Sequence, residues 1–346
     1  MHYKVKHIAF LLMISLVFSA CGTSQNKKDK NTEDTPLPSW INNYKNDYPD
    51  MLFLSSLGVS EYKSVAEKQA YQGIASAFEV HINAVDESTE VTTESADKFN
   101  QTYSEVFNIT TSTDQNLINI KTSESYFDAK SRKYYVLATL NKSNTSAIYQ
   151  KERNKFLADA ESIYAKSKSE NDVLLKVAYI SNSIAKLEKV KNIESKLRIL
   201  DNATMEVNKF KKIHELVIER ERLLESAKVY IENSDDKIFH MLKADFTDLG
   251  FKLTDDKEQA LILVDFTIKM EDSGVVNQDA KFVMWNLDVN LNHNDKKQTF
   301  GIYTSSGRSS QLSANAARER AYYDIDKKIS KEFTPFLIKR ILRVQK

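Results

Sequence analysis

The amino-acid sequence predicts an α+β fold in which two α+β domains are joined by a helical segment. Residues 36–143 and 231–346 each combine a helical repeat of apolar residues with strand-like alternation, whereas residues 144–230 contain neither proline nor glycine. The composition, 41% hydrophobic and 28% charged with 7 Gly and 4 Pro in 346 residues, is typical of a folded, helix-rich body. A chain of this length is expected to divide into domains, because a single core stops growing efficiently near about 250 to 300 residues.

The first 20 residues have the pattern of a signal peptide. Lys4 and Lys6 precede an apolar run from Ile8 to Phe18, and small residues then lead to Cys21. The run is shorter than the roughly 20 apolar residues that a transmembrane helix needs. We therefore expect residues 1–20 to direct export and to be cleaved off between Ala20 and Cys21.

Cys21 is the expected site of lipid attachment. The tract Phe18-Ser19-Ala20-Cys21 resembles the lipobox of bacterial lipoproteins, in which the cysteine thiol takes up a diacylglycerol. An ordinary secretory signal with a chance cysteine is the alternative. Each buried methylene contributes about 0.8 kcal/mol, so two or three fatty chains such as palmitate hold a protein durably on a membrane. No second cysteine is present, which excludes an intramolecular disulfide.

The residues after Cys21 indicate where the anchored protein resides. Gly22 stands where the resemblance to lipoproteins associates Asp with retention on the inner membrane, so we expect the outer membrane. Residues 21–35 hold no large apolar residue and are predicted to form a flexible tether. The charges of this tether are mixed, unlike the acidic run that sends some lipoproteins to the cell surface, so we expect the protein to face the periplasm.

Residues 36–143 read as a small layer of one helix and several strands. The pattern predicts a strand over 51–59 and then a helix capped by Ser64, whose apolar face comprises Ala66, Ala70, Ile74, Ala77, Phe78 and Ile82. Further strands are predicted at 108–111, 117–125 and 134–140. The short connection Asp128-Ala129-Lys130-Ser131 indicates that the last two strands pair in the antiparallel sense.

This segment resembles the Lpp-twenty type lipoprotein domain. The resemblance lies in four tracts: Pro38-Ser39-Trp40, the strand Phe53-Leu54-Ser55-Ser56-Leu57-Gly58, the helix with Ala66, Ala70 and Ala77, and the stretch from Tyr126-Phe127-Asp128-Ala129 to Tyr134-Tyr135-Val136-Leu137-Ala138. It covers about a third of the chain and implies an outer-membrane lipoprotein, in some members associated with flagellar assembly. The shared residues are core and turn residues, so the resemblance supplies no active site.

Residues 144–230 are predicted to be helical, as two or three antiparallel helices with breaks near 167–171 and 201–202. Three apolar stripes support this: Phe156, Ala160, Ile163 and Tyr164; Leu174, Val177, Ala178, Ile184, Leu187 and Val190; and Phe210, Ile213, Val217, Ile218, Leu223 and Leu224. The stripes do not continue as heptads along one seam, so a helical spacer is favoured over a partner-binding coiled coil.

Residues 231–346 predict a second α+β unit. A helix capped by Ser234-Asp235-Asp236 is expected to end at Gly250, and strands are expected at 260–270, 281–292 and 300–303. The alternation in 281–292 predicts one covered and one solvated sheet face. A helix over 314–342, interrupted at Pro335, would cover the apolar face with Ala317, Ala321, Ile325, Ile329, Phe333 and Leu337. Between the last strand and this helix, residues 305–310 are interpreted as a polar turn.

The sequence contains no pattern that indicates catalysis. Beyond Cys21 there is no thiol, no glycine-rich phosphate loop and no serine elbow. The histidines after Cys21 are scattered without the spacing of metal ligands: His81, His214, His240 and His293. The spacing of the carboxylates fits no calcium loop: Asp255, Asp256, Asp265, Glu271, Asp272 and Asp288. Residues 305–310 are interpreted as a plain loop; the alternative is that Arg308 there contacts an anion, together with a helix N-terminus. We therefore expect no enzyme, no cofactor, and no catalytic or metal-binding residue.

The expected function is that of a lipid-anchored envelope protein with a structural or assembly role. Its partners would be the membrane, through the lipid on Cys21, and other envelope proteins. Formal net charge is only +1, from 49 basic and 48 acidic side chains, so nucleic acid is not expected as a partner. The alternative is a periplasmic binding module that holds a small ligand or cell-wall fragment in a groove near Trp285 and the 305–310 turn.

Overall fold

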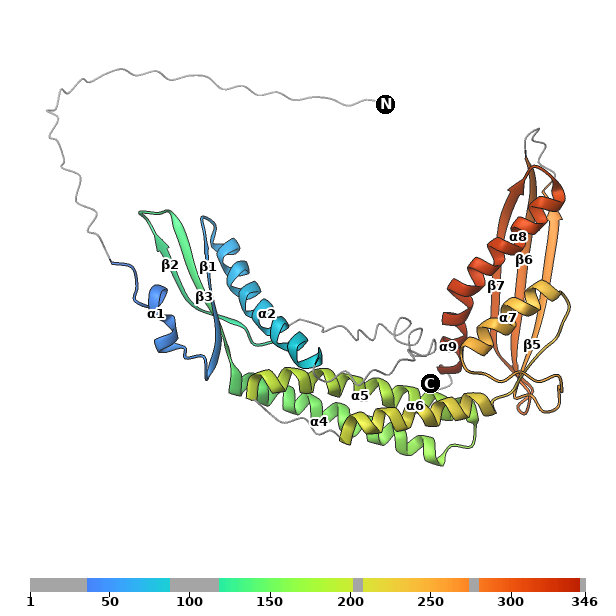
Figure 1. Cartoon of the computed structure of the whole chain (residues 1–346), viewed down its shortest axis with the longest axis horizontal. Helices are drawn as coiled ribbons and strands as arrows, with labels where there is room; N and C mark the ends of the chain where they lie inside the picture. Colours follow the sequence, from blue (N-terminus) through green and yellow to red (C-terminus); the bar gives the residue numbers. More distant parts are fainter. Residues whose placement is uncertain (1–35, 88–117, 202–207, 274–279, 343–346) are drawn as a thin grey trace, which may run out of the picture. The chain divides into compact units, whose positions relative to one another are not determined.

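The computed structural model describes residues 36–87, 118–201, 208–273 and 280–342. The chain divides into two compact units, residues 1–38 and 39–346, and every helix and strand below belongs to the second unit (Figure 1). Two sheets and their covering helices confirm the predicted α+β class. The expected signal peptide, Cys21, the tether and the strand at 108–111 lie outside the described residues.

The first sheet has three antiparallel strands in the order β1-β3-β2: β1 (Phe53–Ser60), β2 (Lys121–Asp128) and β3 (Lys133–Asn141). The antiparallel pairing of β2 with β3 across a short turn is confirmed. In that turn the Asp128 carboxylate accepts hydrogen bonds from the backbone amides of Lys130 (3.0 Å) and Ser131 (3.3 Å). A helix that the sequence did not predict, α1 (Trp40–Asp47), precedes the sheet.

Helix α2 (Lys63–Glu87) packs on this sheet through small residues. An ideal Cβ on Gly58 of β1 would lie 1.9 Å from the Ala66 carbonyl oxygen and 2.7 Å from the Ala70 amide nitrogen. Only glycine allows the two backbones to approach so closely. The predicted apolar face is confirmed for Ala66, Ala70, Ile74 and Phe78, which are buried.

Two details of the α2 prediction are wrong, and a third lies outside the described residues. Ala77 is exposed, because its neighbour Phe78 takes the core position one turn after Ile74. Ser64 is not the cap, since the helix already begins at Lys63 and the Ala66 amide bonds to the Tyr62 carbonyl at 3.0 Å. The side chain of Ile82 lies outside the described part of the chain.

The middle of the chain is helical, as predicted: α4 (Lys142–Ser169), α5 (Val173–Asp201) and α6 (Asn208–Ser226). The break between α4 and α5 falls at residues 170–172, which overlaps the predicted break at 167–171. The second break lies outside the described residues. The three helices share a core of Ala160, Ile180, Ile184, Leu187 and Leu216. Glu219 of α6 accepts hydrogen bonds from Tyr164 (2.9 Å) and Lys168 (2.8 Å) of α4, which joins the first and third helices.

The second sheet has four strands in the order β4-β5-β6-β7: β4 (Val229–Ile231), β5 (Ile262–Asp272), β6 (Lys281–His293) and β7 (Gln298–Gln311). β5, β6 and β7 pair in the antiparallel sense, and β4 adds in parallel to β5. The sequence did not predict β4, because its three residues continue the helical composition of the segment before it.

Helices cover one face of this sheet, and the other face is open, as the alternation in β6 predicted. The covering helices are α7 (Asp236–Asp248), α8 (Ala314–Lys328) and α9 (Thr334–Leu342), with the π-helical turn η1 (Ile329–Phe333) between the last two. Asp235 caps α7 by accepting from the amides of Lys237 and Ile238, both at 3.1 Å. All six predicted apolar residues of α8, η1 and α9 are buried. The interruption predicted at Pro335 takes the form of the π turn.

The interpretation of residues 305–310 as a turn is wrong: β7 continues through them to Gln311 and pairs with β6 along the whole tract. Small residues permit this strand. Gly307 lies opposite Trp285, and an ideal Cβ on it would be 2.4 Å from the indole ring. Ser305 and Ser309 are buried on the helix-covered face. Their small side chains suffice there, because the Trp285 indole over Gly307 fills the space between them. A run of serines therefore forms a strand here for reasons of packing.

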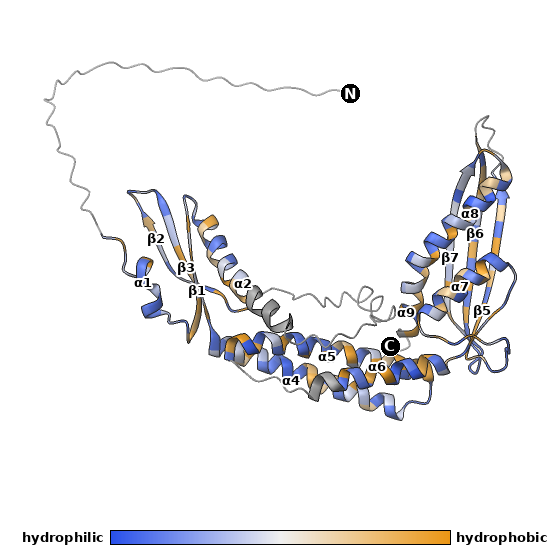
Figure 2. Ribbon diagram, viewed as in Figure 1, coloured by the Kyte–Doolittle hydropathy of each residue, from blue (hydrophilic) through white to orange (hydrophobic). Residues whose placement is uncertain are grey.

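Helix α5 contributes to the cores of both sheets. Its first turns (Leu174, Val177, Ala178) pack with the residues beneath the second sheet, and its last turns (Ile193, Leu197, Leu200) pack with α2 and β3. Apolar and polar residues accordingly alternate along the sheet strands and around these helices in Figure 2. The helical middle is thus part of each packed layer, which a simple spacer would not be.

Candidate functional site

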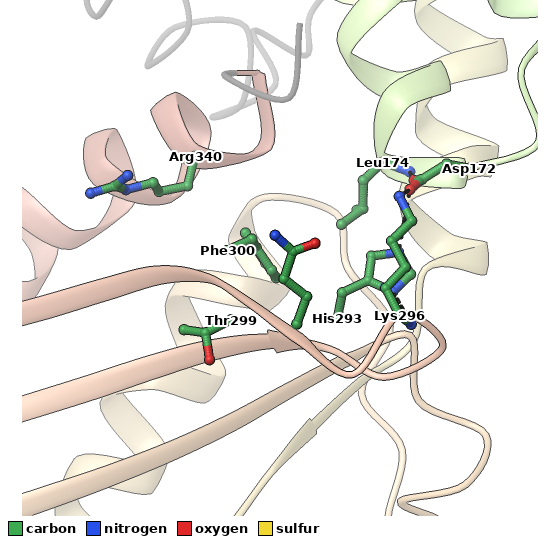
Figure 3. Close-up of a pocket in the computed structure, with 8 residues that line it drawn as sticks. Asp172, Leu174, His293, Lys296, Thr299, Phe300 and Arg340 are labelled. Carbon is green, nitrogen blue, oxygen red and sulfur yellow. Dashed lines mark hydrogen bonds and ion pairs between the residues drawn. The ribbon is translucent and has the colours of Figure 1, made fainter. Parts of the chain in front are cut away.

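A pocket of about 320 Å³ lies where α5, the β6–β7 turn and α9 meet. Its lining comprises Asp172, Leu174, His293, Lys296, Gln298, Thr299, Phe300 and Arg340 (Figure 3). Asp172 and Leu174 come from the start of α5, and His293 to Phe300 come from the end of β6, the turn and the beginning of β7. The Arg340 side chain extends from α9 and points away from Asp172 in Figure 3.

Asp172 is the polar centre of this pocket. Its Oδ1 atom accepts hydrogen bonds from the amides of Leu174 (2.8 Å) and Leu175 (3.2 Å), so the carboxylate caps the first turn of α5. The other oxygen, Oδ2, forms an ion pair with Lys296 and lies 3.4 Å from His293 Nε2, without a well-aligned hydrogen bond to the ring. The Asp172 side chain is only 8% exposed.

The environment of Asp172 favours its charged form. Burial by itself would raise the pKa of this carboxyl group, but the hydrogen bonds from Lys296 and the Leu175 amide, together with the charges of Lys296 and His293, outweigh burial and lower the pKa below its ordinary value. The arrangement fixes the β6–β7 turn to the helix. It places a charged carboxylate beside the Lys296 ammonium group, an arrangement that can bind and position a polar group.

We expect Asp172→Asn to lower the free energy of unfolding by about 1 kcal/mol at neutral pH. Asparagine keeps the helix cap but loses the charge-assisted contacts, including the ion pair with the half-exposed Lys296. A carboxyl group whose pKa is lower in the folded state stabilises the fold at pH values above its unfolded-state pKa of about 3.9. This stabilisation is lost as the pH falls through the folded-state pKa. Urea unfolding from pH 7 to pH 3 should therefore show the two proteins converging at acid pH. Lys296→Ala is the matched control for the ion pair, and a difference independent of pH would contradict the assignment.

A second feature is the outer edge of β7. The amide of Ser273 bonds to the Phe282 carbonyl, and the amide of Asn294 bonds to the Leu261 carbonyl, so the even-numbered residues of β6 direct their backbone groups to the β5 side. Backbone groups alternate in direction along a strand, so the odd-numbered residues of β6 direct theirs toward β7. There they bond to the odd-numbered residues of β7 from Tyr303 to Ser309. The even-numbered residues of β7 from 302 to 310 therefore direct their amides and carbonyls outward.

Lys328 supports this assignment independently. Its ammonium group donates to the Ser306 carbonyl at 2.8 Å, which requires that carbonyl to be accessible from α8 rather than used within the sheet. Among the described residues no other hydrogen bond occupies an outward backbone group of β7 between 302 and 310. Ile302, on the same edge, is 58% exposed. The edge is thus long, solvent-accessible and largely unpaired within the described part of the chain.

The candidate residues from the sequence do not converge on one point. Cys21 and Ala20 lie outside the described residues, as does the environment of the His81 side chain. His214 and His240 are exposed, as expected, whereas His293 is buried beside Asp172. Sequence reasoning missed this pair and Lys296. Asp172 lies one residue after the predicted break at 167–171, and His293 and Lys296 follow the predicted strand at 281–292.

Most of the acidic candidates occupy turns and the open sheet face, whereas Asp272 lies on the helix-covered side and forms an ion pair with Arg318 of α8 at 3.6 Å. Asp256 accepts from the Glu258 amide at 2.9 Å within its own turn, and Asp265 accepts from the side-chain amides of Asn290 (2.7 Å) and Asn292 (2.8 Å) across the strands. Asp288 accepts from Asn286 at 3.0 Å. In the described ranges no three His, Cys, Asp or Glu side chains gather in a way that suits a metal ion.

Trp285, which the sequence placed beside an expected groove, is buried. The indole ring is 4% exposed and packs against Gly307 on the helix-covered side of the sheet. Arg308 lies in the strand, not in a turn or at a helix N-terminus, and stacks over the Phe282 ring at 5.1 Å.

Comparison with known families identifies the first α+β segment. Residues 38–141 match the model of the LPP20 lipoprotein family, which confirms the resemblance noted in the sequence. The match coincides with α1, β1, α2, β2 and β3 and supports a membrane-associated lipoprotein. No curated protein is significantly similar to this chain. None of the described helices has the length and apolar character that a membrane span requires.

Two solved structures are similar to parts of the chain. The secreted protein HP1454 from Helicobacter pylori aligns with 83% of this chain and 97% of its own, at 11% identity and a TM-score of 0.44. A minor lipoprotein from Acinetobacter baumannii aligns with 32% of this chain and 93% of its own, at 17% identity and a TM-score of 0.23. Both scores are below 0.5, so these likenesses carry no conclusion about function.

Proposed function

Because residues 38–141 match the LPP20 lipoprotein family, we propose that this chain is a lipid-anchored protein of the bacterial cell envelope that acts without catalysis, through contacts with other proteins. In this proposal acyl chains on Cys21 hold it on the outer membrane, residues 21–35 form a tether, and the folded body faces the periplasm. The leader pattern before Cys21 and the identity of Gly22 support the anchor and its membrane.

One observation carries the part of the proposal that concerns protein contacts: the second sheet leaves a whole face and a long edge without a covering element among the described residues. Helices α7, α8 and α9 cover the opposite face only. Exposed apolar side chains accompany this open side, with Met284 47% and Ile302 58% exposed. An uncovered sheet edge offers unpaired backbone groups to another chain.

A photo-crosslinking experiment in living cells tests this function. A photoreactive amino acid is placed at Met284 or Ile302 on the open side, and at the exposed His240 on the helix side as the matched control. We expect discrete heavier adducts from the first two positions, absent from the control and lost when Cys21 is replaced. Adducts of equal intensity at all three positions, or none at any position, would contradict a role in specific protein contacts.

A ligand-binding role is the second candidate, and the pocket around Asp172 is the observation that favours it. Its volume of about 320 Å³ is at the lower end of the range for small-molecule sites, and its lining combines Leu174 and Phe300 with polar groups. Thermal unfolding with soluble cell-wall fragments distinguishes the candidates. A rise in melting temperature that disappears in Arg340→Ala would support the ligand role, whereas no rise would leave protein contacts as the better account.

A further inference from the structure

We propose that the outer edge of β7 binds an extended, acidic segment of a partner protein, which joins the second sheet as an additional strand. This inference rests on the proposed function, since it names the surface and the chemistry of one protein contact. The binding groups are the outward amides and carbonyls of Ile302, Thr304, Ser306, Arg308 and Ser310, whose direction follows from the pairing of β6 with its neighbours. Strand addition of this kind obtains affinity from main-chain hydrogen bonds.

The edge lacks most of the devices that normally protect a sheet edge. Natural edges are kept short, interrupted by proline or a bulge, or covered by another element. β2, one of the two edges of the first sheet, follows this rule with a register shift between Thr122 and Glu124. By contrast β7 has 14 residues, no proline, and regular pairing from Gly301 to Gln311. Among the described side chains, Lys328 shields this edge at a single point, where its ammonium group donates to the Ser306 carbonyl.

The charges along the edge define the partner. Arg308 stacks over Phe282, and Lys328 lies 5.3 Å from the Trp285 ring centroid. Arg340 lies over Phe336 at 5.1 Å, and its Cγ atom would be 3.2 Å from a Cβ on Gly301, so it reaches the beginning of the edge. None of the three forms a salt bridge with a carboxylate of the described residues.

The acidic groups nearby are already engaged. Asp324 accepts from the Ser309 hydroxyl at 2.6 Å and pairs with Arg320 at 3.1 Å, and Glu332 accepts from the Tyr303 hydroxyl at 3.4 Å. The cations over the aromatic rings therefore remain available to carboxylates of an incoming chain. Ile302, on the same face of β7 as Arg308, provides an apolar contact for one side chain of that chain. An extended segment rich in Glu or Asp is the sequence that this edge fits.

The test uses the full-length lipidated protein in detergent micelles and a defined probe, the capped nonapeptide Val-Glu-Val-Glu-Thr-Glu-Val-Glu-Val. We expect saturating peptide to slow hydrogen exchange about tenfold or more at the five outward amides of β7. A peptide with Lys in place of every Glu is the charge control and should leave exchange unchanged. Equal protection by both peptides, or protection confined to other strands, would overturn the proposal.

Two variants locate the binding. Thr304→Pro removes an outward amide without breaking the β6–β7 ladder and should weaken peptide binding about tenfold or more, whereas Thr304→Val keeps the amide and should bind as the parent does. Arg308→Glu should weaken binding of the acidic peptide more than Arg308→Gln, and it serves if the proline variant does not fold. Unchanged binding in both Thr304→Pro and Arg308→Glu would overturn the assignment of the site.

Two further outcomes separate this inference from the function on which it rests. Protection of the same amides that increases with protein concentration in the absence of peptide would identify a second copy of the chain as the occupant, and would contradict the acidic partner. Cellular crosslinks from Met284 but not from Ile302, with no effect of the peptide on β7, would refute strand addition and leave the proposed protein-binding function intact.

Discussion

Replacing Cys21 by alanine is expected to move nearly all of the protein from the membrane fraction to the soluble fraction. Alanine has no thiol to accept a diacylglycerol, and the described residues contain no helix suited to span a membrane. Fractionation of cell lysates followed by an alkaline wash measures the effect. Thr23→Ala, two residues along the tether, is the control and should remain with the membrane. A Cys21→Ala protein that still sedimented after the wash would show that something other than lipid anchors the chain.

We expect Gly58→Ala to lower the free energy of unfolding by about 3 kcal/mol, the upper part of the usual range for overpacking. The added methyl group would lie 1.9 Å from the Ala66 carbonyl oxygen and 2.7 Å from the Ala70 amide nitrogen. Both are backbone atoms of α2, so no side-chain rotation relieves the clash, and the helix must move off β1.

Gly73→Ala is the matched control on the facing helix. Its methyl group would meet the Ser56 hydroxyl oxygen at 2.0 Å, but that hydroxyl sits on a side chain that can rotate, although the Ser56 Cβ at 2.9 Å leaves some crowding. Alanine is also better than glycine in a helix by about 1 kcal/mol, which offsets the cost. Urea unfolding of both variants is the measurement. Equal loss of stability in the two would contradict a specific backbone contact at Gly58.

Much of the fold followed from periodicity, and the exceptions have local causes. The alternation in β6 predicted its buried and open faces because Val283, Trp285, Leu287, Val289 and Leu291 differ sharply from the Asn and Asp residues between them. β7 has no such contrast after Tyr303: Ser305 and Ser309 face the core and Ser306 and Ser310 face solvent, so its pattern is invisible in the sequence. What makes it a strand is pairing with β6 and the space that Gly307 leaves for the Trp285 ring.

The candidate sites were harder to predict than the elements. Asp172 and Lys296 are 124 residues apart, and each falls in a connection, where periodicity carries no information. The unpaired edge of β7 could not be predicted from the residues of that strand. Its existence depends on the order of the strands in the sheet. The leader and Cys21, by contrast, form a local signal that the sequence alone can supply.

The mass of the intact mature protein, purified from membranes, tests the central claim most directly. A lipid-anchored protein should give a chain that begins at Cys21 and carries the added mass of a diacylglyceryl group and an amide-linked fatty chain. Alkaline hydrolysis should then remove the two ester-linked fatty chains and leave the glyceryl thioether and the amide-linked chain on Cys21. An unmodified amino terminus, or a chain that retains residues 1–20, would contradict a lipid-anchored protein.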